Sequence, residues 1–123
     1  MPEPERLKPG LTAERTVSVE EKMTVSHTGR PVLSTPMMIS LMESVANDLV
    51  QPLLPAGMVT VGYEVHVKHM APAFPGEEVR VSAELLEVDG RKLLFGVRVL
   101  QGDRPVGEGR HRRTIIQAAR QAS

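Results

Sequence analysis

The stretch TPMMISLMESVANDLVQ, residues 35–51, decides the fold. Thr35 followed by Pro36 is typical of a helix N-cap with proline at the first helical position, and no helix breaker occurs before Pro52. The sequence therefore predicts a helix over residues 36–51, about 24 Å long, which is enough to lie along a sheet and form its core. At about 100° per residue, the apolar side chains of this helix gather on one broad face. They are Met38, Ile39, Leu41, Met42, Val45, Ala46, Leu49 and Val50.

The sequence after this helix alternates between apolar and polar residues, as half-buried strands do. Residues 59–68 place apolar side chains at odd positions, namely Val59, Val61, Tyr63, Val65 and Val67, and polar ones at even positions, namely Thr60, Glu64, His66 and Lys68. Further alternating runs occupy about 79–85, 93–99 and 106–116. Turns are predicted at Asp89-Gly90 and Gly102-Asp103. Four antiparallel strands are therefore expected after the helix.

The sequence before the helix has weaker patterns. Residues 11–25 alternate over short stretches and predict one or two short strands, and residues 27–31 are expected to form a loop. Residues 1–10 carry three prolines and are expected to form a flexible arm, and residues 118–123 a C-terminal tail. The chain is thus predicted to be one domain over residues 11–117 of the α+β class, in which one helix covers one face of the sheet.

A single helix leaves the second face and at least one edge of such a sheet without cover. Uncovered strand edges favour pairing with another chain, and a symmetric dimer is the simplest way to satisfy them. A homodimer is therefore expected.

The composition excludes several classes of function. Fifteen basic and fifteen acidic residues cancel, so nucleic acid is not expected as a partner. The absence of cysteine excludes disulfides, thiolate metal sites and a cysteine nucleophile. No apolar run is long enough to span a membrane, and residues 1–10 lack the apolar core of a signal peptide, so a cytoplasmic protein is expected.

His69 is the first candidate for chemistry. It continues the odd-numbered apolar series of its strand and is therefore predicted to face the helix, whereas His66 lies on the polar side. An imidazole titrates near neutral pH, which suits it to proton transfer. The alternative is a structural histidine at a strand end.

Glu43 is the second candidate. It is the first carboxylate of the predicted helix and lies at the border of the polar stripe, so it is either half desolvated or an ordinary solvated helix residue.

Glycine and arginine residues give two weaker signals. Gly62 interrupts an apolar strand, which marks either a bulge or a close backbone approach whose N–H could stabilise an oxyanion. Residues 110–113, Arg-His-Arg-Arg, alternate between the two faces of the last strand. They are interpreted as a solvated edge strand or as cations for a nucleotide or pyrophosphate tail. No phosphate-binding loop, nucleophile elbow or two-histidine metal spacing occurs, so no metal site is predicted.

Together these residues resemble the fluoroacetyl-coenzyme A thioesterase-like branch of the hotdog-fold proteins. Thr35 lies eight positions before Glu43 in the segment LMESVA, and His69, in VKH, lies twenty-six positions after Glu43 and seven after Gly62. The segments AFPG (73–76), VDGR (88–91) and GEGRH (107–111) extend the resemblance, which runs from about Val32 to Ile116.

The resemblance implies a hotdog fold, with one long central helix wrapped by an antiparallel sheet of about five strands, and a homodimer that hydrolyses an acyl-CoA thioester at the subunit interface. It implies that Thr35, Glu43 and His69 are catalytic and that Gly62 donates its N–H to the thioester oxygen. Glu43 would either attack the thioester carbonyl or activate water, His69 would shuttle the proton, and Thr35 would orient a partner by hydrogen bonding. Arg110 and Arg112 are the candidate cations for the coenzyme A tail. No cofactor is implied, because coenzyme A enters as part of the substrate.

The helical spacing does not allow direct contact between Thr35 and Glu43. Eight residues correspond to about 12 Å along a helix. Either the regular helix begins later than predicted, or the groups converge across a dimer axis or through the substrate.

The substrate is expected to be a general short- or medium-chain acyl-CoA. The fluoroacetyl-selective type has phenylalanines in the approach to the helix, and residues 26–33 contain none. The alternatives are a non-catalytic acyl-CoA-binding domain and an acyl-CoA hydratase or dehydratase.

Overall fold

The computed structural model describes residues 6–26 and 29–119. It contains one long helix, α1 (Thr35–Val50), and seven strands: β1 (Thr12–Ser18), β2 (Thr24–Val25), β3 (Val32–Leu33), β4 (Met58–His69), β5 (Glu78–Asp89), β6 (Lys92–Gln101) and β7 (Arg104–Gln117). Short 3-10 turns precede β2 and follow α1. The predicted α+β class, the helix and the four strands after it are confirmed.

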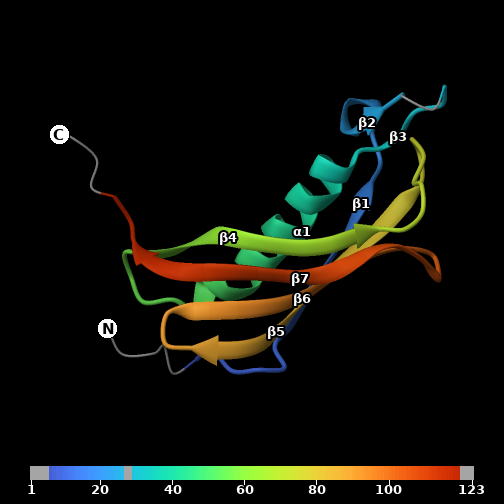
Figure 1. Cartoon of the computed structure of the whole chain (residues 1–123). Helices are drawn as coiled ribbons and strands as arrows, with labels where there is room; N and C mark the ends of the chain where they lie inside the picture. The colour runs from blue at the N-terminus through green and yellow to red at the C-terminus, as the bar shows by residue number, and fades with distance from the viewer. Residues whose placement is uncertain (1–5, 27–28, 120–123) are drawn as a thin grey trace.

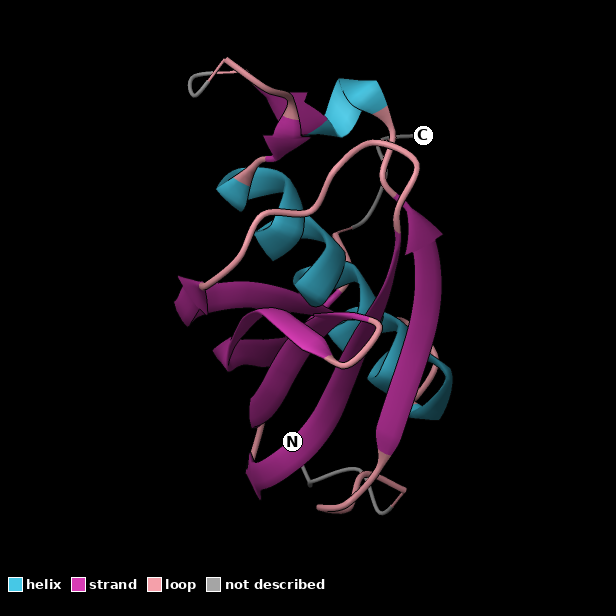
Figure 2. Ribbon diagram, turned by 90° about the vertical axis from the view of Figure 1, so that its right-hand side faces the viewer, coloured by secondary structure: helices cyan, strands magenta, loops and turns pink. Residues whose placement is uncertain are grey.

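Five strands form one antiparallel sheet in the order β1-β5-β6-β7-β4. Figure 1 shows β4, β7, β6 and β5 side by side, with α1 crossing behind them. In the view of Figure 2, α1 runs diagonally across the strands. The helix therefore lies against one face of the sheet, and β1 and β4 are the two edge strands.

The core lies between α1 and the inner face of the sheet. From the helix it takes Met38, Met42, Val45, Ala46 and Val50, and from the sheet mainly Val79, Val81, Leu85, Phe95 and Val99, all at most 2% exposed. Burial of side chains of this size contributes about 1.5–3 kcal/mol each and fixes the helix on the sheet. The predicted apolar face of the helix is thus the face that packs.

The helix begins one residue earlier than predicted, and Thr35 is not its N-cap. Ser34 is the cap: its side-chain oxygen accepts a hydrogen bond from the Met37 N–H at 3.2 Å. Pro36 is then the second helical residue, and Thr35 lies in the first turn. Ser34 and Thr35 both carry a hydroxyl that can cap a helix. Because Ser34 is the cap, the hydroxyl of Thr35 is free to bind a different partner.

The faces of β4 differ from the predicted alternation in its first half. The pairing with β7 shifts between Gly62 and Glu64, which inserts one extra residue, a β-bulge. Before the bulge Thr60 is buried against the helix and Val61 is 42% exposed, so the inward positions there are even. After the bulge they are odd and include Val67 and His69. The bulge that Gly62 suggested is therefore present, and it reverses the predicted faces of Val59 and Val61.

The chain before β1 packs more closely than the predicted arm. Leu7 is 4% exposed within the core, and the Gly10 N–H donates to the Leu85 carbonyl at 2.8 Å. Residues 1–5 of the predicted arm, 27–28 of the predicted loop and 120–123 of the predicted tail lie outside the described residues. In the part of the chain that is described, no helix has the length and apolar character needed to cross a bilayer.

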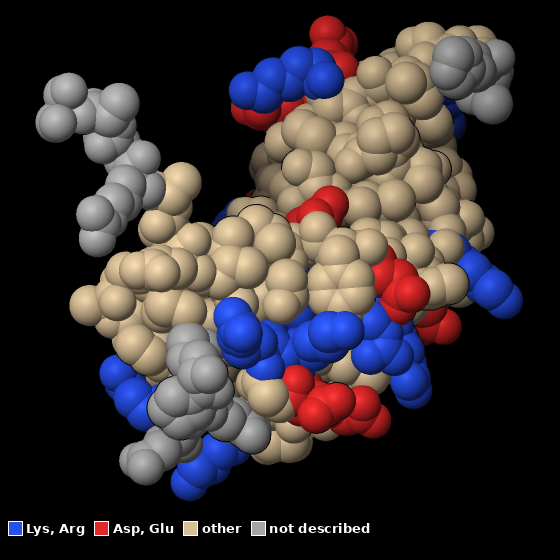
Figure 3. Space-filling model, turned by 60° about the vertical axis from the view of Figure 1, so that its left-hand side comes forward, with Lys and Arg blue, Asp and Glu red and all other residues tan. Residues whose placement is uncertain are grey.

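The surface carries charges of both signs. On the face shown in Figure 3, lysine and arginine side chains lie beside aspartate and glutamate side chains, next to a broad expanse with few charges. This distribution agrees with the zero net charge of the sequence.

Candidate active site

The first cluster of the site joins the start of α1 to the end of β4. Because Ser34 caps the helix, the Thr35 hydroxyl is free, and its Oγ1 lies 2.8 Å from Nδ1 of His69. His69 is the last residue of β4, on the helix side as its position in the strand predicts. A threonine and a histidine that are thirty-four residues apart in the chain are thus hydrogen-bonded.

The other ring nitrogen of His69 has no hydrogen-bond partner among the described residues, although it is buried. The imidazole borders a pocket of about 310 Å³, which is otherwise lined mainly by the apolar residues Val32, Leu33, Met70, Ala71 and Pro72. Burial lowers the pKa of His69 below its ordinary value of 6.5, and the backbone of Ala71 opposes this only in part. The ring is therefore neutral at pH 7, and its second nitrogen is not engaged by another described group.

The second cluster surrounds Glu43, two turns further along α1. Its Oε2 lies 3.8 Å from Nη1 of Arg113 and 4.0 Å from Nε2 of His111, and its side chain is 39% exposed. Glu43 is thus half desolvated, one of the two alternatives for this residue, and it faces a cation.

Arg113 and His111 come from β7 and are almost completely buried, at 8% and 1% exposed. The Arg113 guanidinium donates from Nε to Thr60 Oγ1 at 2.7 Å and from Nη2 to the Thr60 carbonyl at 3.1 Å. Burial lowers the pKa of Arg113 and the Glu43 carboxylate opposes this, but a guanidinium stays charged in proteins. Arg113 is therefore a fixed positive charge beside Glu43.

Sequence reasoning missed Arg113 and His111 as site residues. β7 lies between β6 and β4, so its interpretation as a solvated edge strand is wrong. The available signal was the alternation itself, because His111 and Arg113 share the face of buried Ile115. The same alternation places Arg110 and Arg112 on the opposite, outer face of the sheet.

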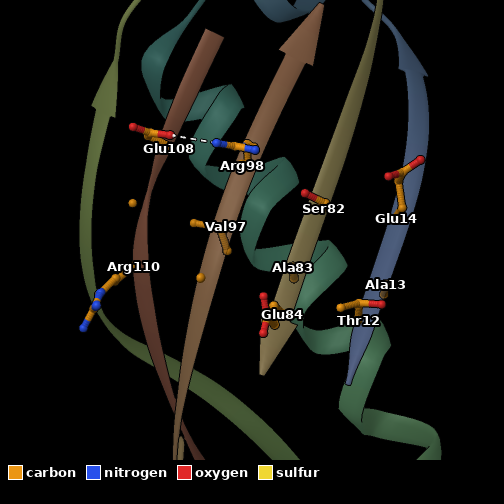
Figure 4. Close-up of a pocket in the computed structure, with 12 residues that line it drawn as sticks. Thr12, Ala13, Glu14, Ser82, Ala83, Glu84, Val97, Arg98, Glu108 and Arg110 are labelled. Atoms are coloured by element: carbon orange, nitrogen blue, oxygen red, sulfur yellow. Dashed lines mark ion pairs between the residues drawn. The ribbon is translucent and has the colours of Figure 1, made fainter. Parts of the chain in front are cut away.

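Arg110 and Arg112 lie away from both clusters. Figure 4 shows Arg110 with Arg98 and Glu108 on the outer face, with α1 behind the sheet. This face holds a shallow groove of about 700 Å³ between β1 and β7. Arg112 pairs with Glu64, with 2.7 Å between Nε and Oε1. That these arginines bind the coenzyme A tail stays a prediction.

Gly62 provides the space in which the second cluster fits. A Cβ at this position would lie 2.7 Å from Cε1 of His111, 2.9 Å from Oε2 of Glu43 and 3.2 Å from Nη1 of Arg113. The bulge suggested by the sequence is therefore present, and three side chains pack closely against this glycine, whereas the approach of a ligand to its backbone stays a prediction. The use of the Gly62 N–H as an oxyanion donor stays a prediction.

Replacing Gly62 with alanine is expected to displace Glu43 and to lower kcat about 10-fold or more, because the added methyl group overlaps three site residues. Thiol release from acyl-CoA and thermal unfolding would be measured on the same preparation. The matched control is Gly96→Ala in β6, where the nearest atom to a Cβ is a Leu86 methyl at 3.4 Å. Equal activity of the Gly62 variant and the wild type would contradict the account.

The structure brings Thr35 and His69 together but does not bring Glu43 to them within one chain. Thr35 and Glu43 lie eight residues apart on the regular helix, about 12 Å along its axis. The helix does not begin later than predicted, so that explanation is excluded. Convergence across a dimer axis or through the substrate remains. Among the described residues, no group of three or more histidine, aspartate or glutamate side chains could hold a metal ion.

Comparisons with known proteins place the chain in one family. A model of the family described as fluoroacetyl-CoA-specific thioesterase matches residues 12–119. The fluoroacetyl-CoA thioesterase of Streptantibioticus cattleyicolor is 36% identical over 85 residues. These residues are 69% of this chain and span 61% of the length of that curated relative.

Solved structures show the same fold. The fluoroacetyl-CoA thioesterase FlK superposes with a TM-score of 0.85 at 30% identity, covering 92% of this chain and 90% of FlK. A variant of FlK was solved in complex with fluoroacetate and CoA. A hot-dog-like protein from Thermanaerovibrio acidaminovorans, 23% identical, has a TM-score of 0.82 and covers 89% of this chain and 83% of its own. The predicted hotdog fold is confirmed, and the chain belongs to the fluoroacetyl-CoA-specific thioesterase family.

Proposed function

We propose that this protein is an acyl-CoA thioesterase that hydrolyses a short- or medium-chain acyl-CoA to the free acid and coenzyme A. The observation that carries the proposal is the hydrogen-bonded Thr35–His69 pair: its imidazole borders a pocket with mainly apolar walls, and one ring nitrogen has no partner among the described residues. Such a pocket suits an acyl chain, and a neutral imidazole at its edge suits proton transfer to and from a thioester. Membership of the fluoroacetyl-CoA-specific thioesterase family supports the same reaction.

The working unit of the proposed enzyme is a homodimer joined through β4. This strand is an edge of the sheet, and it exposes Val61, Tyr63 and Val65 by 42%, 47% and 36%. An exposed apolar edge strand is a template for pairing with another chain. Pairing of two β4 strands around a two-fold axis would extend the sheet from one subunit into the next.

The same two-fold axis would complete the active site. In antiparallel pairing, the end of one β4 lies beside the start of the other. An axis midway between Gly62 and His69 would bring each His69 opposite Gly62 of the partner subunit, which lies against Glu43 of the partner subunit. The Thr35–His69 cluster of one chain and the Glu43 cluster of the other would then flank one substrate.

In the proposed reaction, water adds to the thioester carbonyl while a proton passes to the free nitrogen of His69. The carbonyl oxygen becomes an oxyanion. In this scheme the oxyanion accepts a hydrogen bond from the N–H of Gly62, which lies beside the bulge. When the intermediate collapses, the C–S bond breaks, and the imidazolium returns the proton to the coenzyme A thiolate. Thr35 orients the imidazole, and the Glu43 carboxylate orients and activates the water. No cofactor takes part in this scheme.

The proposed substrate range is broad rather than fluoroacetyl-selective, because residues 26–33 contain no phenylalanine to cover the acyl group. A cytoplasmic location remains a prediction from the sequence.

The proposal is tested by following coenzyme A release with a thiol-trapping dye over a series of acyl-CoAs of increasing length. Turnover of at least one short- or medium-chain substrate is expected. Saturable binding with no thiol release would contradict it and would favour a binding domain. Appearance of a double bond without thiol would favour a hydratase or dehydratase.

The pH dependence of kcat provides a further check. Because burial lowers the pKa of His69 below 6.5, the ring stays neutral as the pH falls through 6.5 and is protonated only at lower pH. We expect kcat to stay level down to 6.5 and to decline only below it. The profile would be recorded by direct absorbance of the thioester, which does not depend on a dye. A decline that begins well above pH 7 would contradict a lowered pKa.

A further inference from the structure

His111 is a buried polar side chain that the proposed reaction has not yet used. It is 1% exposed, and Phe95 stacks on its ring, with centroids 6.3 Å apart and planes at 28°. Most buried side-chain nitrogens are hydrogen-bonded, and both ring nitrogens of His111 have a partner. The partners in this structure assign its protonation state.

Nδ1 of His111 lies 3.0 Å from the Glu64 carbonyl oxygen, which can only accept a hydrogen bond, so Nδ1 carries the proton. Nε2 lies 3.1 Å from Nη1 of Arg113, which can only donate, so Nε2 is a bare acceptor. A doubly protonated ring would direct an N–H at the guanidinium. The arrangement therefore fits one form of the ring, the neutral Nδ1–H tautomer.

The Nδ1 side of the ring holds the backbone of β4 at its bulge. The register shifts between Gly62 and Glu64, and the Glu64 carbonyl that accepts from His111 belongs to this irregular segment. Cε1 of the same ring lies 2.7 Å from the place of a Gly62 Cβ. The ring thus fixes the backbone beside the proposed oxyanion donor.

The Nε2 side of the ring fixes the cation that faces Glu43. Two edges of the Arg113 guanidinium are bound by Thr60, whose hydroxyl in turn donates to Asn47 Oδ1 on α1 at 2.7 Å. His111 accepts from the remaining nitrogen, Nη1, and this is the atom that lies 3.8 Å from Glu43 Oε2. Without this acceptor, Nη1 would lose the bond that sets its direction.

We infer that His111 is a positioning residue: as the neutral Nδ1–H tautomer, it ties the bulge beside Gly62 to the Arg113 guanidinium that holds Glu43. This inference rests on the proposed hydrolysis, because its effect on turnover acts through Glu43. The two hydrogen bonds of His111 can be tested separately, because two different replacements each keep one of them.

Asparagine and glutamine at position 111 separate the two sides of the ring. The asparagine amide is short and can donate to the Glu64 carbonyl in place of Nδ1, but it does not reach Arg113. The glutamine amide extends to the position of Nε2 and can accept from Arg113 Nη1. We expect His111→Asn to fold and dimerise but to lower kcat about 10-fold with KM within about twofold, and His111→Gln to restore kcat to within about threefold of wild type.

The matched control is Glu84→Gln, because Glu84 is exposed on β5, away from β4 and from both clusters. Its kcat is expected to equal that of the wild type. A merely structural role of His111 would lower activity of both variants only in proportion to the folded fraction, measured by thermal unfolding, and that result would overturn the inference.

Nitrogen NMR of the wild-type histidines tests the inference without turnover. The ring whose signals are lost in His111→Gln is expected to be a neutral Nδ1–H tautomer. If those lost signals belong to an Nε2–H tautomer or to a charged ring at pH 7, the inference is overturned. This test holds even if the asparagine variant does not fold. Wild-type turnover together with a fully active, folded His111→Asn variant overturns this inference alone. A wild type that releases no thiol from any acyl-CoA overturns the proposed function and the inference with it.

Discussion

Replacing His69 with alanine is expected to lower kcat for acyl-CoA hydrolysis at least about 100-fold, the low end of the effect of a general acid–base group. The variant removes both the free nitrogen at the pocket and the partner of the Thr35 hydroxyl. No other described side chain is hydrogen-bonded to that hydroxyl in the structure. The loss should therefore fall on kcat, with a smaller change in KM.

The measurement is thiol release from the best acyl-CoA substrate, at saturating concentration, with the folded fraction determined by thermal unfolding. Glu84→Ala is the matched control, because Glu84 is exposed on β5, away from β4 and from both clusters, and its kcat should stay within about twofold of wild type. Wild-type turnover by the His69 variant would show that another group moves the proton.

The second large effect is expected for Glu43→Gln, which should also lower kcat at least about 100-fold. Glutamine keeps the shape of the side chain but removes the charge that faces Arg113 and His111. It has no negative charge with which to polarise the attacking water or to balance the buried guanidinium. The carboxylate is 39% exposed and 3.8 Å from its partner, but the Arg113 side chain is only 9% exposed, so we expect a loss of stability of about 1–2 kcal/mol.

Activity and unfolding of the Glu43 variant should thus change very differently. The control is Glu108→Gln on the outer face of the sheet, where Glu108 pairs with Arg98 at a similar distance, 3.6 Å, but with both side chains about half exposed (Figure 4). We expect that control to retain wild-type kcat. If Glu43→Gln hydrolyses acyl-CoA at the wild-type rate, the carboxylate has no part in the reaction.

Local sequence patterns predicted the framework of the fold. The long apolar face of residues 36–51 and the alternation after it correspond to α1 and to β4–β7. The position of the cap could not be predicted, because Ser34 and Thr35 both precede Pro36 and both can cap a helix. This one-residue difference matters for the site, since it leaves the Thr35 hydroxyl free to bind His69.

The side chains of the second cluster were harder to predict than the backbone. Gly62 signalled a bulge, but the reversal of faces before it depends on which residue is extra in the pairing of β4 with β7. Arg113 was not expected inside, because a buried guanidinium is stable only with partners from other elements, here Thr60, His111 and Glu43. Such partners become visible only once the strands are paired.

The proposed active site is shared between two subunits: the Thr35–His69 pair of one subunit works with the Glu43 cluster of the other. The most direct test mixes unfolded His69→Ala and Glu43→Gln chains in equal amounts, refolds them together and measures thiol release. Half of the dimers are then mixed, and if the site is shared, each mixed dimer has one intact site, so about a quarter of wild-type activity should return. Activity no higher than that of the two variants refolded separately, with mixed dimers demonstrated by mass spectrometry, would contradict a site built from two subunits.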